Sequence, residues 1–191
     1  MFGRRSKFGY PELVTPRLRL CLLAPDQAEL MLAFRQNNRV FLKPWEPLRT
    51  EVYYSKPYWE SQLEAARTEY HHDISLCLSL MPRDEELVIG VCSFTNIVRG
   101  TFQSCHLGYA LGEAWQGQGV MQEALEVAID HVFSRMQLHR IMANYMPHNA
   151  KSGNLLNRLG FRIEGRAESF LKIDGQWADH ILTSLINPTH S

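Results

Sequence analysis

The sequence predicts a mixed α/β fold with one central sheet, and two features of the chain indicate it. Runs that alternate polar and apolar residues, as half-buried strands do, are interleaved with stretches in which apolar residues recur at helical spacing. No internal repeat or low-complexity linker interrupts the 191 residues, a length that suits one domain. In chain order we expect a strand, two helices, three strands, a helix, a strand, a helix and a final pair of strands.

The first half of the chain supplies a leader, one strand and two helices. Residues 1–15 are expected to form a flexible leader, and the domain then spans 16–188. A strand follows over 17–22, where polar and apolar residues alternate. Pro25-Asp26 is a typical helix start, and the second helix is expected from near Ser55 to Tyr70.

The second half alternates strands with two further helices. Gly160 closes the last helix at the position where a glycine commonly ends one, and Asp174-Gly175 predicts a tight hairpin turn. The expected elements are strands at 74–81, 87–95, 104–111 and 140–145, a helix opening at 117–119, a helix at 149–159, and a final hairpin over 170–186.

Charge and composition exclude several classes of function. Lys+Arg and Asp+Glu balance at 20 each, so the chain has no global attraction for nucleic acid or an anionic membrane. The four cysteines form no Cys-x-x-Cys pair and the eight histidines show no metal-ligand spacing, so we expect no metal. No apolar run has the length of a signal peptide or a membrane span, and a reducing cytoplasm is the expected compartment.

The segment from Gln116 to Met121 has the character of a phosphate-binding turn. Gly117 and Gly119 stand between a strand and a helix, and glycine lets a ligand approach the backbone closely. Unpaired amides at the helix start, together with the helix dipole, favour a negative charge there. A plain tight turn into a helix explains the loop alone equally well. The loop lacks Gly-Lys-Ser/Thr, and Gln122 stands where a dinucleotide loop has its third glycine, so nothing indicates ATP, GTP or NAD.

This turn resembles the Gln/Arg-x-x-Gly-x-Gly/Ala motif of the GNAT superfamily of acyltransferases. Gln116 and Gly119 match the motif, whereas Met121 departs from it, which suggests an altered pyrophosphate cradle. A second block follows about thirty residues later, with Asn149-x-x-Ser152 opening a helix and Leu159-Gly160-Phe161 closing it. The resemblance implies the GNAT fold: a mixed, mostly antiparallel sheet of about seven strands, flanked by helices, with two strands splayed around the coenzyme.

Within the superfamily the chain is similar to the Rim-type ribosomal-protein alanine N-acetyltransferases, the RimJ type most of all. The resemblance runs over 16–188 and implies acetyl-CoA as co-substrate. It also implies that the acceptor is the N-terminal alanine of a small-subunit ribosomal protein. The segments that carry this resemblance are 41–47, 94–100, 141–149 and 173–180.

The resemblance further implies which residues meet the coenzyme. Main-chain groups of Tyr109, Ala110 and Leu111 would pair with the pantetheine arm, and one of their N–H groups would polarise the thioester carbonyl. The remaining contacts are expected from Gln116, Gly117, Gln118, Gly119, Val120, Met121, Gln122, Asn149 and Ser152.

The catalytic acid and base are expected from different parts of the chain. Many relatives protonate the thiolate with a Tyr where this chain has Leu156, so Ser152 is the expected acid; a plain hydrogen bond at the helix start is its alternative. His106 stands where relatives often carry a Glu base, and an ordinary pKa near 6.5 suits that role, although a solvent-facing strand histidine explains it as well. Glu46 is either the rival base or the group that binds the ammonium of the substrate.

Trp45 and Asp179 are the other expected acceptor-site residues. Trp45 either walls the acceptor site or packs as a core aromatic beneath its loop. Asp179 either lies where the peptide enters or stabilises the turn at Asp174-Gly175. An N-terminal α-amine, with a pKa of about 7.7 to 8.0, needs less help from a base than a lysine at about 10.4, so a missing strong base is less damaging to N-terminal acetylation.

Three functions remain open from the residues. The first is acetylation of a protein N-terminus. The second is transfer to a small amine such as an antibiotic or a polyamine; a polyamine site should carry clustered acidic residues, and only Glu46 and Glu51 stand near the predicted loop. The third is a non-catalytic acyl-CoA-binding or ribosome-assembly protein, because both the usual Tyr and the usual Glu are replaced. The oligomeric state is not indicated.

Overall fold

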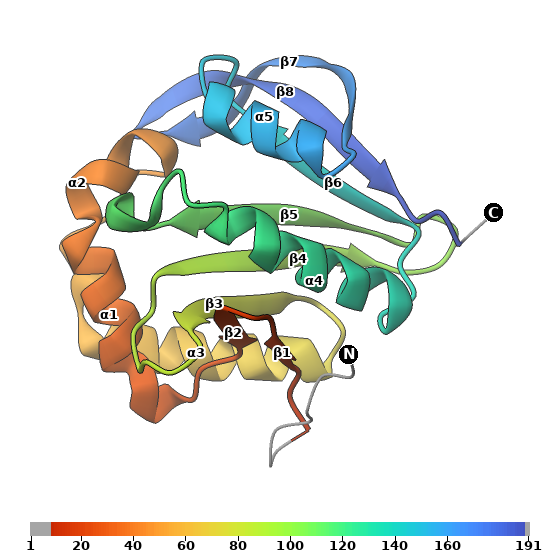
Figure 1. Cartoon of the computed structure of the whole chain (residues 1–191). Helices are drawn as coiled ribbons and strands as arrows, with labels where there is room; N and C mark the ends of the chain where they lie inside the picture. Colours follow the sequence, from red (N-terminus) through yellow and green to blue (C-terminus); the bar gives the residue numbers. More distant parts are fainter. Residues whose placement is uncertain (1–8, 190–191) are drawn as a thin grey trace.

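The computed structural model describes residues 9–189, which form one mixed sheet with helices on both faces (Figure 1). Its strands are β1 (Glu12–Val14), β2 (Leu18–Cys21), β3 (Leu76–Pro82), β4 (Gly90–Val98), β5 (Ser104–Leu111), β6 (Arg140–Tyr145), β7 (Arg162–Ile173) and β8 (Gln176–Ile186). The α-helices are α1 (Ala28–Asn37), α2 (Arg39–Leu42), α3 (Lys56–His71), α4 (Val120–Ser134) and α5 (Ala150–Arg158). Four 3-10 turns complete the described elements: η1 (Pro25–Gln27), η2 (Lys43–Trp45), η3 (Glu51–Tyr54) and η4 (Glu113–Trp115).

The expected mixed, mostly antiparallel sheet is confirmed, with eight strands in place of about seven. The strand order is β1-β2-β3-β4-β5-β6-β8-β7, and every neighbouring pair is antiparallel except β5 with β6. The additional strand is β1, which pairs Leu13 with Leu20 of β2. The expected leader over 1–15 is therefore too long at its C-terminal end, because three residues are too few for an alternating pattern to show. Residues 1–8 of that leader lie outside the described residues.

The parallel pair β5–β6 separates part-way along its length. Pairing is limited to three residues of each strand, Ser104–His106 against Arg140–Met142. β5 continues to Leu111 and stays paired with β4, while β6 continues to Tyr145 and stays paired with β8. The two strands therefore splay from His106 onward, as Figure 1 shows, and the expected opening in the sheet is confirmed.

Alternation along the strands builds two cores, one on each face. Cys105, Leu107 and Leu111 of β5 belong to the core that packs beneath α4 and α5. Ala110, on the other face of the same strand, packs against the core formed with α1 and α3. The strand period of two thus fixes which residues near the splay face which layer of helices.

The final hairpin begins earlier than the sequence predicts. β7 starts at Arg162, and the strand pair is irregular between Ala167 and Leu171, where Ser169 has a positive φ of 46°. The turn at Asp174-Gly175 is confirmed, with φ of 43° and 82° at its two central residues. Positive φ at both positions is the geometry of a type I′ turn, for which Asp-Gly is a favoured pair.

Candidate active site

The glycine loop lies between η4 and α4 with its open side toward solvent. Gly117 and Gly119 both have a φ of 73°, in the left-handed region that favours glycine. A Cβ added at Gly117 would meet nothing within 4 Å, and one at Gly119 would meet only the Arg17 guanidinium at 3.7 Å. Because the first amides of α4 have no intrahelical acceptor, this turn offers donors to an anion with room for it to approach.

Side chains of the motif build the loop and do not cover it. Gln116 donates from Nε2 to the carbonyl of Leu111 at 3.1 Å, and Gln118 donates to the carbonyl of Ala114 at 2.9 Å. Met121 is buried in the core beneath α4. The side chain that departs from the motif therefore leaves the open side of the loop clear, as the two glycines lead one to expect.

Gln122 joins α4 to α5. Its side chain donates to Glu126 one turn further along α4, at 3.0 Å, and accepts from Nε of Arg158 at the end of α5, also at 3.0 Å. This residue lies at the first turn of α4, so the bond to Arg158 fixes the distance between the glycine loop and the helix that carries Ser152.

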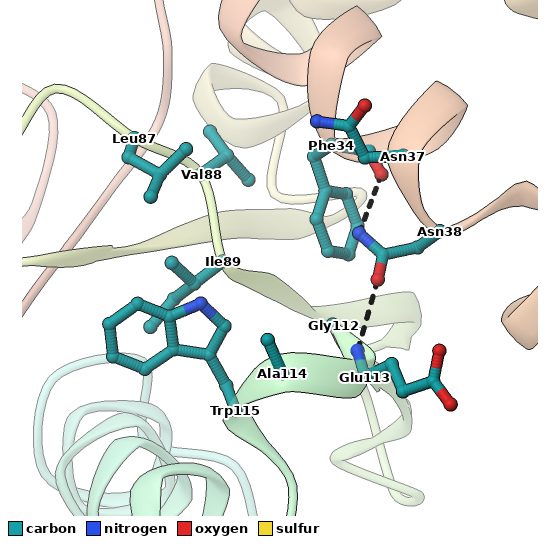
Figure 2. A pocket seen from close by; sticks show the side chains of 10 residues that line it. All are labelled: Phe34, Asn37, Asn38, Leu87, Val88, Ile89, Gly112, Glu113, Ala114 and Trp115. Carbon is teal, nitrogen blue, oxygen red and sulfur yellow. Dashed lines mark hydrogen bonds between the residues drawn. The ribbon is translucent and has the colours of Figure 1, made fainter.

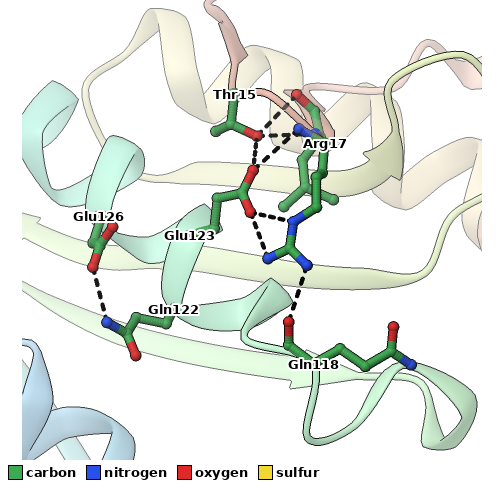
Figure 3. Close-up of polar contacts among 7 residues, drawn as sticks. Thr15, Arg17, Gln118, Gln122, Glu123 and Glu126 are labelled. Atoms are coloured by element: carbon green, nitrogen blue, oxygen red, sulfur yellow. Dashed lines mark hydrogen bonds and ion pairs between the residues drawn. The ribbon is translucent and has the colours of Figure 1, made fainter.

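A network around Glu123 ties the N-terminal segment to the glycine loop (Figure 3). Glu123 accepts from the hydroxyl of Thr15 at 2.6 Å, and from Nε and the backbone N–H of Arg17 at 2.6 and 3.2 Å. Arg17 also donates to the carbonyl of Gln118 at 3.0 Å. Burial alone would raise the pKa of Glu123, but these donors outweigh it and lower the pKa, so the carboxylate stays charged and paired.

The guanidinium of Arg17 remains half exposed beside the loop. It offsets the charge of Glu123, which would otherwise oppose an anion at the start of α4.

Ser152 lies across the splay from β5, in the first turn of α5. Asn149 is the N-cap of that helix, and its side chain accepts from the backbone N–H of Ser152 at 3.1 Å. The hydroxyl of Ser152 lies 2.6 Å from the phenol of Tyr109 on β5. Two expected coenzyme contacts, Asn149 and Tyr109, are thus brought directly to the expected acid.

His106 belongs to the other face of the sheet. It is the last residue of β5 that pairs with β6, and it shares its face with Ala110, whereas Tyr109 faces α4 and α5. Among the described residues, its Nδ1 is buried without a hydrogen-bond partner. Burial lowers the pKa of His106, which keeps the imidazole neutral at pH 7 and leaves it able to accept a proton.

Glu46 is held by two arginines. Its carboxylate accepts from Arg35 at 2.7 Å and lies 3.6 Å from Nε of Arg49, and the side chains of Glu46 and Arg35 are only 16% and 11% exposed. The backbone carbonyl of Glu46 accepts from the N–H of Asp174, which attaches this loop to the tip of the β7–β8 hairpin. These contacts give Glu46 a structural role in holding the segment 43–49 in place.

Trp45 lies at the end of the loop nearest α5. Its ring is 38% exposed and packs against the ring of His148, which precedes α5, with centroids 5.6 Å apart. Trp45 therefore connects η2 to the segment before α5, and its exposure rules out the alternative of a core aromatic.

Asp179 is engaged within the hairpin. Its carboxylate accepts from the backbone N–H of Ser169 at 2.9 Å and from Arg166 at 2.6 Å. It therefore secures the irregular segment near Ser169, several residues away from the Asp174-Gly175 turn.

Residues 17–162 match the acetyltransferase (GNAT) domain family. The chain belongs to this family. It is 45% identical over 188 residues to the [ribosomal protein uS5]-alanine N-acetyltransferase of Escherichia coli, covering 98% of this chain and 97% of the relative.

Two solved structures resemble this GNAT acetyltransferase closely. The ribosomal-protein-S5-alanine acetyltransferase of Vibrio fischeri has a TM-score of 0.90 and 36% identity, covering 94% of this chain and 98% of that one. Mycobacterium smegmatis RimJ, in complex with CoA-disulfide, has a TM-score of 0.83 and 30% identity, covering 88% and 81%.

Two hollows of the acetyltransferase lie beside elements of the site. One, of about 420 Å³, lies between the end of α1, residues 87–89 and residues 112–115 (Figure 2). There Asn38 accepts from the N–H of Glu113 and fixes the segment that leads into the glycine loop. The other, of about 510 Å³, lies between α5, β6 and the start of β7.

Three contacts at the GNAT site were not predicted from the sequence. The first is the hydrogen bond between the side chains of Tyr109 and Ser152. The second is the Arg17–Glu123 pair, which joins residues 106 positions apart. The third is the packing of Tyr145 against Gly153, where an added Cβ would lie 2.8 Å from the ring. A glycine inside a predicted helix, which costs about 1 kcal/mol, was a signal for the last contact.

No other ligand class is indicated by the described residues. Within 9–189 no group of three or more His, Cys, Asp or Glu side chains is placed to hold a metal ion. No helix in that range has the length and apolar character to cross a membrane. The four cysteines are free, and burial raises the pKa of Cys105 to about 12, as expected for thiols that pack in the interior.

Proposed function

We propose that this acetyltransferase transfers the acetyl group of acetyl-CoA to the N-terminal α-amine of a protein, an alanine at the start of a small-subunit ribosomal protein. The single observation that carries this proposal is 45% identity, over nearly the full length of both chains, to an enzyme named for that activity. A ribosomal-protein substrate implies that the enzyme works in the cytoplasm.

The residues present fit coenzyme A. The open glycine loop, the first amides of α4 and the exposed guanidinium of Arg17 suit the pyrophosphate. The stretch of β5 from Tyr109 to Leu111 lies beyond the last pair with β6, which frees one edge of its backbone to pair with the pantetheine arm. A similar structure was solved in complex with CoA-disulfide, which supports coenzyme A as the ligand class.

Acceptor and donor would meet at the splay from opposite faces. His106 lies on one face of β5, where its neutral imidazole would take the surplus proton of the amine, directly or through water. Ser152 lies on the other face, where its hydroxyl would give a proton to the departing sulfur. Main-chain N–H groups of β5 would stabilise the negative charge that develops on the carbonyl oxygen.

The loop that carries Trp45 and the tip of the β7–β8 hairpin would border the acceptor. They contact each other through the Glu46 carbonyl and Asp174, and Trp45 reaches the segment before α5. The acidic residues of this region are already paired, Glu46 with two arginines and Glu51 with Arg39. A free acidic cluster to attract a polyamine is therefore lacking in the described part, which favours a protein terminus over a polyamine.

The test is acetylation of the small-subunit ribosomal proteins with labelled acetyl-CoA, followed by mass spectrometry of each labelled peptide. We expect the label on one N-terminal alanine. Label on lysine side chains alone would contradict the proposal. Coenzyme binding without any turnover would instead support a non-catalytic binding protein.

A further inference from the structure

The first turn of α5 lies between tyrosines from the two splayed strands. Tyr109 reaches it from β5, with its phenol 2.6 Å from the Ser152 hydroxyl. Tyr145 reaches it from β6, and its ring and hydroxyl lie within about 3 Å of where a Cβ on Gly153 would stand. Ser152 is consequently fixed at two points, through its backbone N–H by Asn149 and through its hydroxyl by Tyr109.

The direction of the hydrogen bond between Tyr109 and Ser152 decides whether Ser152 can act as an acid. A phenol and a hydroxyl each carry one proton and can each accept a bond. Burial raises the pKa of Tyr109 to about 12, with the bond to Ser152 opposing the rise, so the resting enzyme has a protonated phenol at any physiological pH. If Ser152 donated to Tyr109, its only proton would be turned away from the reaction. If Tyr109 donates to Ser152, the proton of Ser152 is free for a third group.

We propose that Tyr109 is a positioning residue for acetyl transfer, donating its hydrogen bond to Ser152 and so directing the serine proton at the leaving sulfur. This inference rests on the proposed function. It also supplies what Ser152 lacks when it acts alone, since an alkyl hydroxyl is a weaker acid than a phenol.

Every proton moved in this step comes from Ser152, Tyr109, the amine or solvent. As the C–N bond forms and the C–S bond breaks, Ser152 gives its proton to the sulfur and takes the phenolic proton of Tyr109. The amine loses its surplus proton to His106 or to water. That proton returns through solvent to the Tyr109 phenolate, so one amide and one thiol form with no net proton consumed.

The test compares Tyr109→Phe, Ser152→Ala and the double variant in steady-state kinetics with an alanine-starting peptide. Tyr109→Phe keeps the ring and removes only the hydroxyl. We expect kcat to fall at least about 10-fold in each single variant, with the KM for acetyl-CoA changed by less than about 3-fold. Because the two residues act as one unit, the double variant should be no slower than the slower single variant.

Tyr54→Phe is the matched control, since Tyr54 packs on Arg39 in the α1–α3 layer and its ring contact survives loss of the hydroxyl. It should keep the wild-type kcat. Calorimetric binding of coenzyme A confirms that each variant is folded at the site. Two outcomes would overturn this inference while leaving the proposed function intact. In one, the wild type is active and Tyr109→Phe keeps its kcat. In the other, the fold-losses in kcat of the two single variants multiply in the double variant. An inactive wild type would overturn the proposed function on which it depends.

Discussion

In the proposed mechanism, single residues at the splay divide the proton transfers between the two faces of β5. His106 and Tyr109 are three positions apart, so the strand period turns their side chains to opposite faces. The opening between β5 and β6 begins at His106, which gives both groups access to the same space. An acid on one side of the reacting carbonyl and a base on the other would suit transfer from a thioester to an amine, because the sulfur gains a proton and the nitrogen loses one.

His106→Gln tests the base. Burial lowers the pKa of His106, so the neutral imidazole persists below pH 6.5, and the contribution of His106 to the wild-type kcat should be lost only as pH falls through that lowered pKa. The variant should lose about 10-fold or more in kcat at neutral pH and should lack this part of the acid limb, while the part set by the acceptor amine remains. The measurement is kcat against pH with both substrates saturating. A variant with the wild-type rate and profile would exclude His106 as the base.

Glu46→Gln separates a structural carboxylate from a catalytic one. Removing it leaves the charge of Arg35 in a site where that side chain is 11% exposed, so we expect a loss of about 2 kcal/mol in unfolding free energy. The folded enzyme should retain its kcat within a few-fold. Urea unfolding and kinetics check the two parts.

Glu51→Gln is the control for Glu46, because Glu51 pairs with Arg39 at the exposed surface and should cost little or nothing. A stable Glu46→Gln variant with abolished turnover would instead make Glu46 the base.

At the scale of elements, the start of α4 is assembled from distant parts of the chain. Arg17 and Thr15 reach it from the N-terminal segment, Gln122 links it to α5, and Asn38 of the α1–α2 junction fixes the segment before it. These contacts hold the glycine loop in place, while the space beside Gly117 and Gly119 stays open. The result is a preformed turn at a helix start, with one cation beside it, which suits the binding of an anion.

Gly119→Asp tests that site against a matched control. Gly119 and Gly100 have nearly the same φ, 73° and 72°, and neither is crowded, so an Asp strains both backbones alike. Only at Gly119 does the carboxylate oppose a pyrophosphate, and we expect the Kd for coenzyme A to rise at least about 10-fold there. Gly100→Asp, in the turn between β4 and β5, should bind normally. If calorimetry gave the two variants the same Kd for coenzyme A, this loop would not be the pyrophosphate site.

At the scale of the whole molecule, most of the fold was predictable because its strands and helices carry clear periodicities. The limits of β5 and β6 were predicted as they are found. β1 was missed because three residues show no period, and its place depends on pairing with β2. The irregularity near Ser169 depends on Asp179, ten residues away along the chain and across the strand pair.

The site was predictable in its backbone more than in its side chains. The glycine loop, the Asn149 cap and the splay follow from local sequence and resemblance. The contacts of Tyr109, Arg17 and Glu46 are tertiary, since each joins segments that only the folded sheet brings together. Sequence and family resemblance together could name Ser152 and Glu46 as chemical groups, but they could not tell that one faces the splay and the other is bound by arginines.

The most direct test uses two forms of one peptide, taken from the N-terminus of ribosomal protein uS5 and beginning with alanine. One form has a free α-amine, the other has that amine blocked, and both contain an unmodified lysine. Each peptide is incubated with acetyl-CoA and the enzyme, and mass spectrometry counts the acetyl groups that it gains. We expect the free terminus to gain one acetyl group and the blocked peptide to gain none. Equal acetylation of both peptides, or of neither, would exclude the N-terminal amine as the acceptor.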